Sequence, residues 1–128
     1  ALARLRAWQI LRDETLLTEA RLALRKVAEV TPSLDNFSLC HGRAGNADVL
    51  LYASQVLQEE SWQREAERVA RAGIEQFEQR RIPWPCGLPG ANETPDLMLG
   101  LAGIGYFYLR LADPAKTPPV TLIAQPMG

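Results

Sequence analysis

The chain has 128 residues, of which 47% are apolar and 23% charged, as is typical of a folded globular protein. This composition excludes a disordered chain, which would lack the apolar area that offsets ordering entropy, and two cysteines are too few for a disulfide-stapled miniprotein. The charges nearly cancel, with 14 basic against 15 acidic residues, so we expect no basic surface for nucleic acid or an anionic membrane.

Apolar residues at helical spacing predict two helices before residue 31. The first, over residues 2–12, has an apolar face made of Leu2, Leu5, Trp8 and Leu11. Asp13 is placed to cap the second, whose apolar positions are Leu16, Ala20, Ala23, Leu24 and Val27. Thr31-Pro32-Ser33 ends this helix, because proline lacks an N–H donor and disfavours helix in the residue before it. Residues 34–45 are then expected to form a loop.

The next two helices differ in kind. From Asn46 to Leu57 nearly every residue is apolar, which indicates a helix buried on most of its sides. The helix after it has one apolar face opposite a charged one, and that face holds Trp62, Ala66, Val69, Ala70, Ile74 and Phe77. Residues 82–95 are rich in proline and glycine and predict a long loop, a kind of segment that is often functional.

An uncharged run from Leu97 to Leu109 predicts a last buried helix, with Thr94 as its cap and Pro95 as its first residue. A membrane span needs about 20 apolar residues, so the run is too short to be one. Val120-Thr121-Leu122-Ile123 is expected to form a short strand or an extended tail. The predicted helices thus alternate between buried and amphipathic, beginning with a buried one.

A short motif repeats ahead of the last two buried segments. Gly42-Arg43-Ala44-Gly45 recurs 58 residues later as Gly100-Leu101-Ala102-Gly103. A two-helix unit with this period predicts an all-α fold of helical repeats, in which small residues let inner helices approach closely. Two coincidental small-residue turns would give the same pattern, and that alternative stays open.

Cys40 and His41 are adjacent sulfur and imidazole groups, which are ligand types that bind zinc. The irregular backbone expected before Gly42 would let both side chains reach one ion. A zinc site takes three or four protein ligands, and Cys86 in the proline-rich loop is the other candidate. The alternatives are a buried Cys40 thiol beside a half-exposed histidine, Cys86 as an apolar filler, or a Cys40–Cys86 disulfide in an oxidising compartment.

Three segments resemble one family. Ser38 to Asn46, with the sequence Ser-Leu-Cys-His-Gly-Arg-Ala-Gly-Asn, resembles the second zinc-binding motif of lanthionine synthetase C-like cyclases. Thr94 to Tyr106 resembles the final inner helix of that family. Residues 109–114 and 120–122 resemble the C-terminus of the bifunctional class II lanthipeptide synthetases (LanM). The resemblance covers nearly the whole chain, with its motifs in the family's order.

The resemblance implies an α/α toroid, a double ring of helices, of which residues 1–128 would be an incomplete C-terminal portion. It implies an enzyme that adds cysteine thiols to dehydroalanine or dehydrobutyrine and so forms (methyl)lanthionine rings, with Zn²⁺ deprotonating the substrate thiol. The implied partners are a lanthipeptide precursor peptide and the rest of the synthetase chain, and the implied location is the bacterial cytoplasm.

Residue by residue, Cys40 and His41 match two of the family's three zinc ligands, whereas Cys86 matches none and is expected to be structural. The third ligand, a cysteine, and the acid–base histidine are expected upstream of Ala1. The chain alone is therefore expected to bind zinc weakly, to be inactive and to self-associate through apolar surface. A catalytically silent peptide-binding module, a glutathione-adding enzyme and a freestanding helical scaffold remain alternatives.

Overall fold

The computed structural model describes residues 1–90 and 93–122, and over these residues the fold is all-helical, as predicted. Its α-helices are α1 (Leu2–Leu11), α2 (Glu14–Val30), α3 (Arg43–Leu57), α4 (Glu60–Gly73) and α5 (Leu101–Ala112). A 3₁₀ turn, η1 (Thr31–Ser33), follows α2, and a π-helical turn, η2 (Ile74–Glu78), follows α4. None of the helices described is long and apolar enough to cross a membrane.

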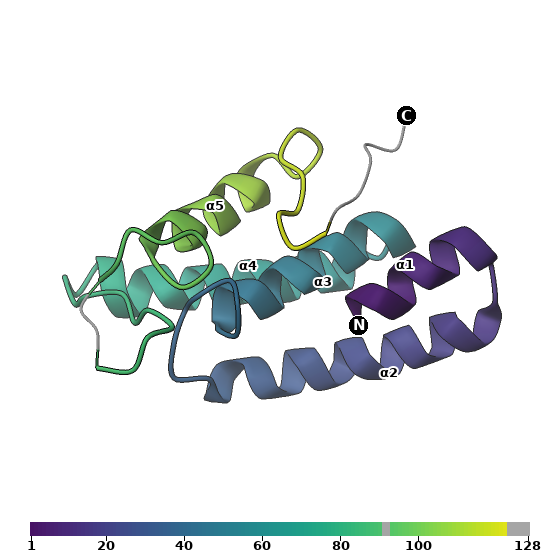
Figure 1. The fold of residues 1–128 in the computed structure, drawn as a ribbon, viewed down its shortest axis with the longest axis horizontal. Helices are drawn as coiled ribbons and strands as arrows, with labels where there is room; N and C mark the ends of the chain where they lie inside the picture. The colour runs from purple at the N-terminus through teal and green to yellow at the C-terminus, as the bar shows by residue number, and fades with distance from the viewer. Residues whose placement is uncertain (91–92, 123–128) are drawn as a thin grey trace.

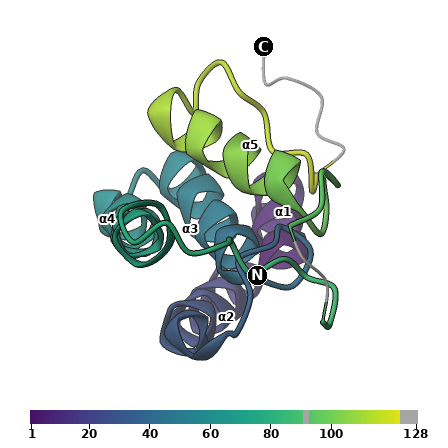
Figure 2. The same ribbon diagram turned by 90° about the vertical axis from the view of Figure 1, so that its left-hand side faces the viewer.

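α3 lies at the centre and contacts each of the other four α-helices (Figures 1 and 2). Most of its residues are buried, which confirms the prediction for this segment: Ala44, Gly45, Ala47, Asp48, Leu50, Leu51, Tyr52, Ala53 and Ser54. The helix begins at Arg43 rather than at the predicted Asn46, because Gly42 is its N-cap. The central helix is therefore buried from its first turn.

α2 and α4 each bury one face and expose the other, as predicted. The Asp13 carboxylate caps α2 by accepting a hydrogen bond of 2.8 Å from the backbone N–H of Thr15. Leu17 is buried in α2, and the predicted Leu16 is only half-buried. Ile74 is exposed although it continues the apolar face of α4, and the π-helical turn η2 begins at this residue.

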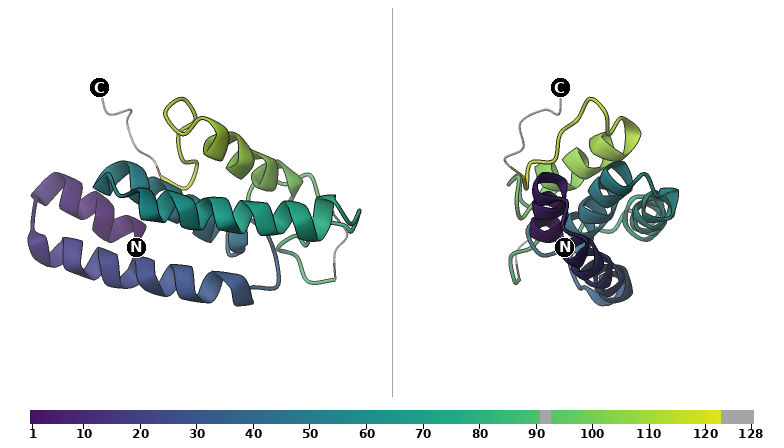
Figure 3. Two further views of the ribbon diagram at one scale, coloured as in Figure 1. Left: turned by 180° about the vertical axis from the view of Figure 1, so that it is seen from behind. Right: turned by 90° about the vertical axis from the view of Figure 1, so that its right-hand side faces the viewer.

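α1 and α5 are much more exposed than predicted, so the expected alternation is wrong at both of its ends. α1 buries only Leu5. α5 buries one face, which includes Phe107, whereas Leu109 is 63% exposed and Leu97 and Met98 before it are exposed as well. The two helices lie on the outside of α3, and no other described helix covers their outer faces (Figure 3).

The segments on either side of α5 also differ from their predictions. The helix begins at Leu101, so Thr94 is not its cap and Pro95 is not its first residue. Residues 93–96 are instead irregular, and residues 97–100 form a turn and a bend. Val120 to Leu122 lie in a turn and a bend rather than in a strand, and Ile123 is outside the described residues.

A buried ion pair joins α3 to α5. Asp48 and Arg110 are 2% and 1% exposed, and the Arg110 guanidinium donates hydrogen bonds to the Asp48 carboxylate and to the carbonyl of Thr117. Burial raises the pKa of Asp48, although the positive charge of Arg110 acts in the opposite direction. Each of these buried charges needs the other, because a single charge left in the bundle would be desolvated without compensation.

Asp48→Asn is expected to lower the free energy of unfolding by about 3 kcal/mol, because it leaves the charge of Arg110 buried without its partner. The control is Glu29→Gln, which breaks the exposed Lys26–Glu29 pair and should cost less than about 1 kcal/mol. Urea unfolding followed by circular dichroism measures both losses. Equal losses in the two variants would contradict this role of the ion pair.

Candidate metal centre

Cys40 and His41 lie on the turn formed by residues 39–41, directly before α3. The backbone N–H of Gly42 closes this turn by donating to the carbonyl of Ser38 at 3.1 Å. Both Cys40 and His41 are exposed, so the alternative of a buried Cys40 thiol is wrong. The turn therefore presents a thiol and an imidazole to the outside of the bundle.

The same turn occurs again before α5, over residues 97–99. The N–H of Gly100 donates to the carbonyl of Asp96 at 3.0 Å, which matches the bond from Gly42 to Ser38. A second backbone hydrogen bond recurs as well. The N–H of Arg43 donates to the carbonyl of Asn36 at 3.0 Å, and the N–H of Leu101 donates to the carbonyl of Thr94 at 2.7 Å. All of these partners are 58 residues apart, so the repeat predicted from the sequence is also a repeat of structure. Met98 and Leu99 stand where the first turn has Cys40 and His41.

The last glycine of each motif explains why the helices begin at these turns. A Cβ atom on Gly45 would lie 2.0 Å from the carbonyl oxygen of Leu39, and one on Gly103 would lie 1.8 Å from that of Leu97. In each case the loop before the helix folds back onto the first helical residues. The carbonyl oxygen then lies so close to the glycine Cα that a residue with a Cβ atom would collide with it. This contact places the start of α5 at Leu101 and excludes the predicted start at Thr94.

The two turns lie against each other and against the proline-rich loop. The N–H of Cys40 donates to the carbonyl of Met98 at 2.9 Å. The N–H of Gly87, in the proline-rich loop, donates to the carbonyl of Leu99 at 2.7 Å. Three segments distant in sequence therefore meet at the end of the bundle where the long loops gather (Figure 1).

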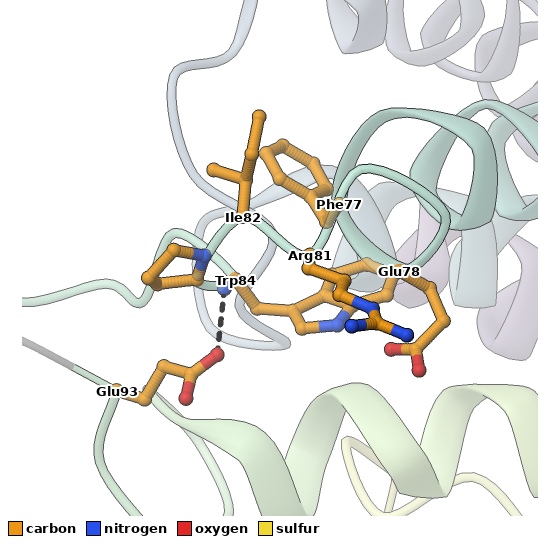
Figure 4. A pocket seen from close by; sticks show the side chains of 7 residues that line it. Phe77, Glu78, Arg81, Ile82, Trp84 and Glu93 are labelled. Carbon is orange, nitrogen blue, oxygen red and sulfur yellow. Dashed lines mark hydrogen bonds between the residues drawn. The ribbon is translucent and has the colours of Figure 1, made fainter.

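Trp84 fixes the proline-rich loop to the helices. Its ring centroid lies 5.0 Å from that of Phe37 and 5.1 Å from that of Phe77, and its backbone N–H donates to a Glu93 carboxylate oxygen at 2.8 Å (Figure 4). The shallow pocket drawn there, of about 300 Å³, has Glu78, Arg81 and Glu93 among its lining residues but no cysteine or histidine. The contacts of Trp84 anchor the loop here, and the candidate metal ligands Cys40 and His41 do not line this pocket.

A second cavity, of about 450 Å³, lies beside His41. Residues 35–36 and 85–90 form the rest of its wall, and Cys86 is among them. Cys86 is buried, as expected for a structural residue, and both cysteines are free thiols, so the Cys40–Cys86 disulfide is not formed.

Cys40 and His41 fit zinc as two of its ligands. They offer a thiol and an imidazole, both exposed, from one turn that is held by backbone hydrogen bonds. Among the residues that the structure describes, no three Cys, His, Asp or Glu side chains lie close enough to hold a metal ion. Cys86 therefore does not complete a three-ligand site with the pair.

Sequence reasoning missed two residues that contact this turn. Met98 could have been found from the 58-residue period, which makes it the counterpart of Cys40. No sequence pattern points to Gly87, because it lies in the proline-rich loop, outside the 58-residue repeat, and meets His41 only in the folded structure.

Gly45→Ala is expected to destabilise the fold by about 2 kcal/mol, because the new methyl group would collide with the Leu39 carbonyl. The matched control is Gly105→Ala in α5, where no atom lies within 4 Å of the added carbon. Since glycine is a poor helix former, this control should be neutral or stabilising by up to about 1 kcal/mol. Thermal unfolding compares the two, and a Gly45→Ala variant as stable as the wild type would refute the close approach.

The family model described as lanthionine synthetase C-like protein matches residues 1–122. The match covers every helix that the structure describes and both glycine-led turns. No curated protein and no solved structure matches the chain.

Proposed function

The chain belongs to the lanthionine synthetase C-like family, and on that premise we propose that it is part of a zinc-dependent peptide cyclase. The reaction joins a cysteine thiol of a precursor peptide to a dehydroalanine or dehydrobutyrine of the same peptide. A carbon–sulfur bond forms at the β-carbon, the alkene electron pair moves to the α-carbon, and a proton is added there. The thiol gives up one proton and the α-carbon takes one up, so the reaction needs no oxidant or reductant.

The observation that carries the proposal is the exposed Cys40–His41 pair on its hydrogen-bonded turn. An exposed thiol next to an exposed imidazole is a donor set suited to zinc, and the family match covers both residues. We propose that the third protein ligand, a cysteine, and an acid–base histidine are supplied by residues outside this sequence. Cys40 and His41 would then hold the ion from one side.

Zinc, when bound, would lower the pKa of the substrate thiol, so that the nucleophilic thiolate is available near neutral pH. The residues of this chain would fix the ligands and accommodate the peptide. The carbonyl of Met98 holds the backbone of Cys40, which limits how far the turn can move. The cavity beside His41 offers about 450 Å³ for the peptide segment that carries the reacting groups.

Cys40→Ala and His41→Ala, each made in the full-length synthetase that we propose, are expected to lose most of the bound zinc. Cyclisation of a dehydrated precursor should fall by about 100-fold or more, because the substrate thiol is no longer activated. Metal analysis and mass spectrometry after thiol labelling measure zinc and ring formation. The control for bound zinc is Cys86→Ala, a change at the other free thiol, which should leave the bound zinc unchanged. The control for ring formation is Glu29→Gln, a change in the exposed Lys26–Glu29 pair of α2, which should leave cyclisation unchanged.

The outcomes of this experiment separate the alternatives. Loss of zinc without loss of cyclisation would exclude the proposed mechanism, because ring formation would then not depend on the metal held by Cys40 and His41. A synthetase variant set in which zinc and cyclisation are both absent from the start, while the precursor peptide still binds, would favour the catalytically silent module. Zinc-dependent addition of glutathione, with no ring formed in any peptide, would identify a glutathione-adding enzyme instead. Retention of zinc in both ligand variants would remove Cys40 and His41 from the metal site.

The 128-residue chain alone is expected to bind zinc weakly and to form no rings, because two protein ligands do not hold the ion firmly. The measurement is metal analysis of the purified chain after dialysis against a chelator. Stoichiometric zinc that resists the chelator would contradict the proposal that a further ligand comes from outside this sequence.

A further inference from the structure

Gly87 lies against the imidazole ring of His41. A Cβ atom on this glycine would be 2.9 Å from Cε1 of His41, 2.9 Å from Oγ of Ser38 and 3.0 Å from Cδ2 of Leu99. Three side chains thus fill the space that any other residue at position 87 would need. One of the three is the candidate imidazole ligand.

The backbone around Gly87 is tied down at three points. The N–H of Gly87 donates to the carbonyl of Leu99 at 2.7 Å, and the carbonyl of Pro85 accepts from the N–H of Phe37 at 2.7 Å. Trp84, directly before this stretch, packs in the aromatic cluster with Phe37. The glycine therefore has little freedom to retreat from the ring.

The burial of the three neighbours decides which of them would yield to a larger residue. Ser38 is fully buried, and its hydroxyl donates to Oδ1 of Asn36 at 2.7 Å, so moving it would break a buried hydrogen bond. Leu99 is half-buried, and its backbone already holds Gly87. His41 is exposed and can rotate into solvent at the lowest cost. A side chain at position 87 would therefore displace the imidazole first.

We propose that Gly87 is a positioning residue for His41. Because Gly87 has no side chain, the imidazole ring of His41 has room to lie against the Gly87 Cα. Gly87 and His41 both line the cavity of about 450 Å³, so the ring lies at the edge of that cavity. A ring that already lies there needs less rearrangement when a ligand arrives, which reduces the conformational entropy that binding would otherwise cost. The relevance of this role to zinc rests on the proposed function, whereas the contact itself does not.

The experiment is an NMR comparison of the wild-type chain with Gly87→Ala and, as the matched control, Gly105→Ala. His41 is the sole histidine of the chain, so its ring signals need no further assignment. In the wild type we expect a nuclear Overhauser contact between the α-protons of Gly87 and Hε1 of His41. In Gly87→Ala the Hε1 signal should shift, whereas in Gly105→Ala it should keep its wild-type position.

Two results would overturn the inference. One is the absence of the Gly87–His41 contact in the wild type, a test that does not depend on any variant folding. The other is an unchanged His41 signal in a Gly87→Ala chain whose circular dichroism shows that it is folded.

Zinc titration followed on the same His41 signal tests the link to the metal. Gly87→Ala should weaken zinc binding by about 10-fold relative to Gly105→Ala, as is common when a residue that supports a ligand is changed. Equal affinities in the two variants would overturn the positioning role toward the metal. Zinc is added in large excess, because the chain alone is expected to bind it weakly. If zinc in excess still moves no His41 signal in the wild type, the proposed function fails, and the ring contact alone decides the inference.

Discussion

The candidate site depends on the close approach of a carbonyl oxygen to the first turn of a helix. At Gly45 and again at Gly103, the chain folds back so far that the preceding turn touches the helix backbone. This fold-back sets where α3 and α5 begin and brings the turns before them side by side. The N–H of Cys40 donates to the carbonyl of Met98, and this hydrogen bond links the two turns. The exposed thiol and imidazole thus lie on a turn whose close approach to α3 requires a glycine at position 45.

The buried helix α3 holds the other described helices together. The helix touches every other α-helix, and its buried positions include one carboxylate, Asp48, which is matched by Arg110 of α5. A buried ion pair adds little to stability compared with apolar packing, but it penalises any arrangement that separates its partners. The ion pair therefore favours one position of α5 relative to α3. The two turns that precede these helices are joined by the hydrogen bond from Cys40 to Met98.

Sequence patterns predicted the features that depend on nearby residues. Helical spacing located α2, α3 and α4, and Asp13 was recognisable as a cap from its residue type and position. Two predictions for the Leu97–Leu109 run were wrong. The run was expected to be buried, but an uncharged sequence does not show whether another element covers it, and Leu109 is exposed. The helix was expected to begin at Pro95, but residue preferences do not show the turn that delays its start to Leu101. Cys40 and His41 were evident from their chemistry. Gly87 was not, because its contact with His41 exists only once two distant loops meet.

The counterpart of Cys40-His41 in the second turn is Met98-Leu99, a pair that offers neither a thiol nor an imidazole. Both turns nevertheless share two backbone hydrogen bonds, from Gly42 to Ser38 and from Arg43 to Asn36 in the first turn and from Gly100 to Asp96 and from Leu101 to Thr94 in the second. These shared bonds join main-chain atoms, so they do not depend on which side chains stand at positions 40, 41, 98 and 99. One backbone turn thus displays a thiol and an imidazole at one position of the fold and two apolar side chains at the other.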